Sequence, residues 1–136
     1  MNNLSFDNGF KELSINGDEN RVIRFNPCDY ELIKRAEGIY ERLDKEFGEI
    51  DKKDIDTLDK LSEKDIAVRK EIDYLLNAEV SNVVFGKTNC LSISNVNYIF
   101  DNFLTALMGY IETSIKEEEK KNNDITKKYT KQVKKW

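Results

Sequence analysis

The chain has 136 residues, of which 39% are hydrophobic and 35% are charged, and its formal net charge at pH 7 is −4. This length and composition predict a single domain with a modest core and a well-solvated surface. The acidic balance excludes general nucleic-acid binding, which needs a basic face, and no run of about 18 apolar residues is present to span a membrane.

The charge is divided unevenly along the chain. Residues 1–115 carry 22 acidic and 14 basic side chains, whereas residues 116–136 carry 4 acidic and 8 basic ones. An acidic body with a cationic end predicts a tethered segment that meets a partner. We therefore expect a domain over residues 1–116, followed by a basic amphipathic tail over residues 117–136.

Residues 4–26 are expected to be extended. Leu13 and Ile15 alternate with polar neighbours, residues 16–20 have the composition of a turn, and residues 21–25 alternate again. This pattern predicts an N-terminal β-hairpin. Its apolar face should lie on helices, because an isolated hairpin is marginal in water.

Helical spacing of the apolar residues follows the hairpin. We expect a mainly α bundle with three principal helices, near residues 27–47, 54–77 and 95–118, and a C-terminal helical tail. Asn26 is the expected N-cap of the first helix, since asparagine is a preferred capping residue. Residues 80–85 predict one short helical turn between the second and third helices.

The third helix is expected to organise the fold. Ser94 is its expected N-cap, and Phe103 and Leu107 should be deeply buried at the centre of its apolar stripe. At steps of three and four residues, this stripe contains Val96, Ile99, Phe100, Phe103, Leu104, Leu107, Met108, Ile111 and Ile115. The upstream elements are expected to cover it.

The sequence lacks the residue patterns that carry catalysis. It contains no histidine, which is the usual general base near neutral pH and the commonest metal ligand. The stretch 86–88 matches the last letters of a phosphate-binding loop, but Ser81 stands where that loop needs a glycine. The acidic segment 54–59 lacks the glycine of a calcium loop. We expect no enzyme activity, no cofactor and no bound metal.

The two cysteines and the N-terminal residues both bear on the cellular compartment of the protein. Cys28 and Cys90 are far apart in sequence, which predicts two reduced thiols rather than a disulfide framework or a zinc site. Residues 1–6 lack the basic and apolar regions of a signal peptide. We therefore expect a cytoplasmic protein.

The C-terminal segment has a pattern of its own. Ile125, Tyr129, Val133 and Trp136 recur at helical spacing between lysines. The pattern leaves three alternatives open: a frayed helix end, partner docking and binding to a membrane surface. The expected partner-binding residues are these four and Tyr110, one of several aromatic residues beyond the needs of a three-helix core. The lysines would also attract the acidic body of a second copy, which makes the tail a route to homo-oligomers.

Five short segments carry a resemblance to a known family. They are FDNG at 6–9, VIRFNP at 22–27 with Asp29, EIDYL at 71–75, VFG at 84–86 and NFLTAL at 102–107. In this order and spacing the chain resembles, over residues 4–115, the small tail assembly chaperones of long-tailed phages and prophages of Gram-positive bacteria.

The resemblance implies a non-enzymatic helical protein that is encoded beside the tape measure protein. Such chaperones coat the long, aggregation-prone tape measure helix during tail assembly in the bacterial host cytoplasm, and they leave before the virion is complete. The family has no catalytic motif to carry over. Two alternatives belong to other classes: a structural tail or connector subunit that is retained in the phage particle, and a regulatory module that acts on a host protein through the basic tail.

Overall fold

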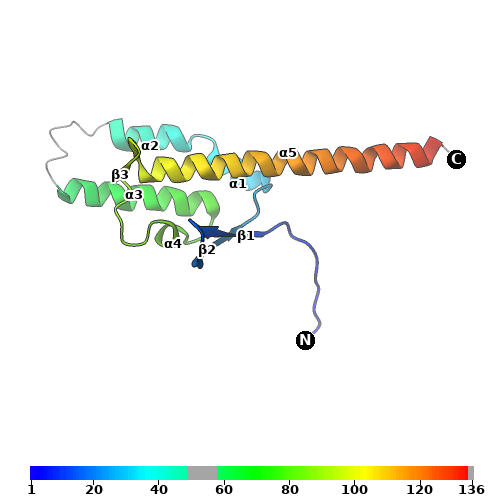
Figure 1. Ribbon diagram of the computed structural model, residues 1–136, viewed down its shortest axis with the longest axis horizontal. Helices are drawn as coiled ribbons and strands as arrows, with labels where there is room; N and C mark the ends of the chain where they lie inside the picture. Colours follow the sequence, from blue (N-terminus) through cyan, green and yellow to red (C-terminus); the bar gives the residue numbers. More distant parts are fainter. Residues whose placement is uncertain (49–57, 135–136) are drawn as a thin grey trace.

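The computed structural model describes residues 1–48 and 58–134, with side chains for residues 1–46 and 58–123. The elements in chain order are β1 (Lys11–Ile15), β2 (Asp18–Phe25), α1 (Tyr30–Ala36), α2 (Ile39–Gly48), α3 (Leu58–Leu76), α4 (Ser81–Phe85), β3 (Ile93–Ser94), β4 (Asn97–Tyr98) and α5 (Ile99–Lys134). The predicted mainly α class is confirmed. In Figure 1, the axes of α2, α3 and α5 are nearly parallel, with α2 running opposite to α3 and α5. The β1–β2 hairpin and α4 lie along one side, and α5 continues past the body.

The predicted N-terminal hairpin is confirmed. β1 and β2 pair antiparallel across Asn16 and Gly17, whose φ angles of 52° and 76° suit a tight hairpin turn. Ile23 and Phe25 are each 2% exposed, whereas Val22 between them is 41% exposed. The period-two pattern therefore places one face of β2 in the core, as the alternation of side chains along a strand requires.

The helix predicted over residues 27–47 is divided, which corrects the sequence prediction. It forms α1 and α2 because Gly38 has a φ of +78°, outside the helical region. The N-cap is Asp29 and not Asn26: the Asp29 side chain accepts a hydrogen bond from the Glu31 N–H at 2.9 Å. A glycine inside a helical pattern is often tolerated, so the break is visible only in the backbone.

Arg42 fixes the joint between α1 and α2. Its guanidinium donates to the carbonyl oxygens of Arg35 and Glu37, at 3.3 and 3.5 Å, where α1 ends. The same side chain pairs with Glu71 of α3 at 2.9 Å. These bonds satisfy carbonyls that the end of α1 leaves without helical partners, and they hold the joint against α3.

α3 agrees with the second predicted helix from its first described residue onward. The predicted start at residues 54–57 lies outside the described residues, as does most of the acidic segment 54–59. The short helical turn predicted at 80–85 is confirmed as α4. Asp73 of α3 accepts hydrogen bonds from the N–H groups of Val80 and Ser81, at 2.9 and 2.7 Å, and so satisfies the first turn of α4.

The third predicted helix begins later than expected. β3 and β4 form a small second hairpin, whose turn residues Asn95 and Val96 have φ angles of 52° and 63°. Because α5 begins at Ile99, Ser94 is not its N-cap, and Val96 is 93% exposed instead of lying on the apolar stripe. The helix also ends later than predicted, at Lys134.

The apolar stripe of α5 nevertheless forms the centre of the core. Phe100, Leu104 and Leu107 are 3%, 0% and 4% exposed. The buried cluster around them includes Ile23, Phe25, Leu32, Ile39, Leu43, Val68, Ile72, Leu75, Leu76, Val84 and Phe85. The predicted deep burial is confirmed for Leu107 and wrong for Phe103, which is only partly buried. Phe103 lies where the core opens into a surface groove.

Candidate docking groove

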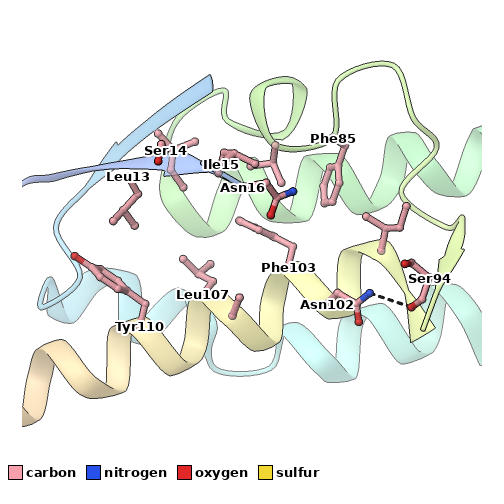
Figure 2. Close-up of a pocket in the computed structure, with 14 residues that line it drawn as sticks. Leu13, Ser14, Ile15, Asn16, Phe85, Ser94, Asn102, Phe103, Leu107 and Tyr110 are labelled. Atoms are coloured by element: carbon pink, nitrogen blue, oxygen red, sulfur yellow. Dashed lines mark hydrogen bonds between the residues drawn. The ribbon is translucent and has the colours of Figure 1, made fainter. Parts of the chain in front are cut away.

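A groove of about 530 Å³ lies between α5 and the β1–β2 hairpin (Figure 2). Phe103, Leu107 and Tyr110 of α5 point toward β1 across the groove, and Phe85 of α4 stands at one end. The lining residues are Leu13, Ser14, Ile15, Asn16, Ile23, Val84, Phe85, Ser94, Ile99, Asn102, Phe103, Ala106, Leu107 and Tyr110. None of these lining residues carries a charge, so the groove offers an apolar surface with a few neutral polar groups.

The position of Phe103 explains its partial burial. The ring packs edge-on against Phe85, with the two centroids 5.8 Å apart, which is a favourable aromatic geometry. Leu104, the next residue along α5, is fully buried. Because neighbouring residues are about 100° apart around a helix, Leu104 points into the core while Phe103 faces the groove. The apolar pattern of α5 predicts which face of the helix is buried, but it does not predict which side of that face the other elements leave open to solvent.

α5 carries an unusual uncharged stretch beside the groove. No charged residue occurs between Asp101 and Glu112, although 35% of the whole chain is charged. Several positions in this stretch are small and exposed, namely Thr105, Ala106 and Gly109. Because this face carries no charge, a binding partner would not have to remove water from charged groups. Because its side chains are small, the backbone of a partner could approach α5 closely.

Tyr110 connects the groove to a second cavity farther along α5. Its ring packs edge-on against Phe25 with the centroids 6.2 Å apart. The second cavity, of about 510 Å³, shares Tyr110 and is bordered by charged residues such as Lys11, Glu117 and Lys121. The surface along α5 therefore changes from apolar to polar at Tyr110.

Hydrogen bonds hold the walls of the groove in place. The Asn102 side chain donates to the Ser94 carbonyl at 3.1 Å and ties β3 to α5 (Figure 2). Arg21 of β2 donates to the carbonyl oxygens of Val83 and Val84, the first at 2.8 Å, and ties the hairpin to the end of α4. The groove is therefore preformed, which reduces the entropy that a ligand must lose on binding.

A polar cluster around Arg69 and Asp65 lies outside the groove and has a structural role. Arg69 of α3 bonds to the carbonyl oxygens of Gly86 and Thr88 and pairs with Asp65 at 3.1 Å. Burial raises the pKa of the Cys90 thiol, and the neighbouring Asp65 carboxylate raises it further. A thiol in this state is not a nucleophile near neutral pH.

The half-buried Cys28 lies in the polar cavity beyond Tyr110. Burial raises the pKa of its thiol, the negative charge of Glu118 raises it further, and Lys11 acts in the opposite direction. Both cysteines are free thiols in the structure. Within the described ranges, no group of three or more carboxylates and thiols is arranged to hold a metal ion.

The structure describes only part of the predicted partner-binding set. Tyr110 lines the groove. Ile125, Tyr129 and Val133 lie on the helical backbone of α5, but their side chains are not described, and Trp136 lies outside the described residues. The sequence reasoning missed the groove formed by Leu13, Phe85 and Ala106 with their neighbours. The absence of charged residues between Asp101 and Glu112 is the sequence signal that could have indicated it.

The rest of the molecule adds two findings. No helix among the described residues is both long enough and apolar enough to cross a bilayer.

Comparison with protein-family models, with curated proteins and with solved structures finds no match for this chain. The function therefore has to follow from the groove and from the resemblance in the sequence.

Proposed function

We propose that this chain is a phage tail assembly chaperone that binds the tape measure protein in the bacterial cytoplasm and has no enzymatic activity. The single observation that carries the proposal is the preformed, uncharged groove along α5, between Ile99 and Tyr110. The sequence resemblance supplies the identity of the client, and the groove supplies a surface of suitable chemistry.

The groove suits an amphipathic helix. Ile99 to Tyr110 span about 16 Å along α5, or about three helical turns, and a docked helix would place apolar side chains there at steps of three and four residues. A long client with repeated apolar stripes offers many such segments. Short apolar contacts of this size are individually weak, which allows the chaperone to leave when the tail tube closes around the client.

The C-terminal tail is a second surface in this proposal. Ile125, Tyr129, Val133 and Trp136 would extend the contact along the same helix, beyond the polar cavity. The lysines of this segment would pair with acidic residues of the client or of a neighbouring copy. The groove provides the apolar contact, and the tail provides attraction that depends on salt.

Co-expression with the tape measure protein that the resemblance implies as a gene neighbour tests the proposal. The chain should keep that protein soluble and co-purify with it. Ala106→Arg places a long charged side chain on the exposed wall of the groove and should abolish both effects. The matched control is Ile66→Asp, at a 54% exposed apolar position on α3 that does not line the groove, and it should behave like the original chain. Equal solubilisation by the two variants would overturn the proposal.

A second experiment separates a departing chaperone from a retained subunit. Mass spectrometry of purified particles should find few or no copies of this chain. Abundant copies in complete particles would instead establish the structural alternative, in which the groove binds a permanent neighbour.

A further inference from the structure

The N-terminal arm, residues 1–8, carries large apolar side chains that the chain's own core does not bury. It has no helix or strand, and all of its side chains are exposed. Leu4 is 86% exposed and Phe6 is 75% exposed. Because the burial of such side chains is favourable, Leu4 and Phe6 are available to pack on another surface.

The base of the arm is anchored. The Asn26 side chain donates to the Asn8 carbonyl at 3.2 Å. Gly9 has a φ of +78°, and a Cβ there would lie only 2.7 Å from the Asn26 amide nitrogen. This close approach sets the direction in which the arm leaves. Figure 1 shows the arm leading away from the body, with its end away from α5.

A surface that fits the arm lies beside β1. Within the described part of the chain, β1 pairs only with β2, so its other edge has no partner strand. Residues 13–16 all line the groove, and the strand therefore borders an apolar hollow along most of its length. An unpaired strand edge is a template for an added strand, and a pocket beside the edge selects alternate side chains.

The arm has the pattern that this surface requires. Leu4 and Phe6 are separated by one residue, so they face the same side of an extended chain, while Asn3, Ser5 and Asp7 face the other. We propose that the arm of one copy adds as a strand to the free edge of β1 in a second copy and places Leu4 and Phe6 in that copy's groove. The exchange is reciprocal in a two-fold dimer, in which each copy donates an arm and receives one.

The arm and the proposed client use the same groove, so the arm of a second copy protects it until a client displaces that arm. The exchange itself does not depend on the identity of the client. Its tests contain only this chain, and they succeed or fail whether or not the proposed function is correct.

Cross-linking between differently labelled copies tests the exchange. One preparation carries Ser5→Cys and the other carries Ser14→Cys, both with Cys28→Ser; Cys90 is fully buried and stays. Ser5 alternates with the apolar residues of the arm, and Ser14 is an exposed residue at the border of the groove. Because cysteine is close to serine in size, the two substitutions should leave the proposed contact largely unchanged. A short bis-maleimide should join the two preparations into a heterodimer. Pairing Ser5→Cys with Glu63→Cys, an exposed position on α3, is the matched control and should give far less product.

A single chain with both Ser5→Cys and Ser14→Cys separates exchange from self-contact. At high dilution, a cross-link confined to this one chain means that the arm folds onto its own groove, and it overturns the proposal. A heterodimer yield no greater than that of the Glu63→Cys control also overturns it.

Light scattering gives an independent measure. Leu4→Asp combined with Phe6→Asp should weaken self-association by at least about tenfold, because two large apolar side chains are no longer buried. The control Leu58→Asp changes an apolar residue that is 78% exposed at the start of α3 and should leave association unchanged. An unchanged dimer fraction in the double variant would rule the exchange out.

Discussion

Asp65 shows how one side chain can join two distant parts of the chain. Its carboxylate on α3 accepts a hydrogen bond from the Cys90 N–H at 2.8 Å and pairs with Arg69 at 3.1 Å. Burial by itself raises the pKa of Asp65, but the bonds from Cys90 and Arg69 outweigh it and lower the pKa below its ordinary value of 3.8. A carboxyl group of this kind stabilises the fold above that value, and the stabilisation is lost as the pH falls through the lower pKa of the folded state.

We therefore expect Asp65→Asn to destabilise the protein at pH 7 and to have a smaller effect as the pH falls below 3.8. The amide keeps an acceptor for the Cys90 N–H but loses the charge that pairs with Arg69, at a cost of about 1–2 kcal/mol. Urea unfolding at pH 7 and at pH 3 measures the difference. A loss of equal size at both pH values would show that packing, and not charge, is responsible.

The contrast between Phe103 and Leu104 gives a second prediction for single residues. Leu104→Ala opens a cavity in the centre of the core and should cost about 2–5 kcal/mol. Phe103→Ala removes a larger side chain but should cost less, because water already reaches the ring from the groove. Denaturant midpoints of the two variants compare them directly. A greater loss for Phe103→Ala would mean that the groove is closed in solution.

At the level of elements, two glycines have opposite roles. Gly38 separates α1 from α2 with a φ of +78°, and a Cβ there would approach the Arg42 guanidinium to 3.3 Å. Gly109 lies inside α5 with open space around it. We expect Gly38→Ala to destabilise the fold by about 1–2 kcal/mol and Gly109→Ala to stabilise it by about 0.5–1 kcal/mol. Thermal melts of both variants test the pair, and a shift in the same direction for both would contradict this account.

The sequence predicts those elements whose periodicity decides their structure. Alternation identifies the hairpin around Asn16 and Gly17, and helical spacing identifies α3 and α4. The boundaries that it misses depend on single backbone angles, such as the positive φ of Gly38 and Asn95. Propensity alone does not determine whether an asparagine or glycine adopts such an angle, because contacts such as those of Arg42 stabilise it.

The candidate groove is harder to predict than the fold, because it is made from separate elements. Leu13, Phe85 and Ala106 are far apart in the chain and meet only after α4 and the hairpin have docked. Tyr110 was predicted as a contact residue and does line the groove. The contact proposed for the tail stays a prediction, since its side chains lie outside those described.

At the scale of the whole molecule, the part of α5 that follows Ile115 contributes little to the core. The side chains of residues 116–123 are all exposed, and Figure 1 shows this part of α5 extending past the body. Removing residues 122–136 should therefore leave the melting temperature of dilute protein nearly unchanged. Calorimetry of the truncated chain measures this, and a clear drop would place the tail within the core. Light scattering on the same sample shows whether the tail, in addition to the arm, affects self-association.

The extension of α5 also affects how the protein moves through solution. About 28 Å of helix, from residue 116 to residue 134, lies beyond the body. An elongated protein experiences more frictional drag than a compact protein of the same mass. The 15.9 kDa chain should therefore sediment more slowly, and elute earlier from a sizing column, than a compact protein of that mass. A single copy will therefore resemble a larger particle by elution volume. Only a mass measured independently of shape, by light scattering or sedimentation equilibrium, will count the copies correctly.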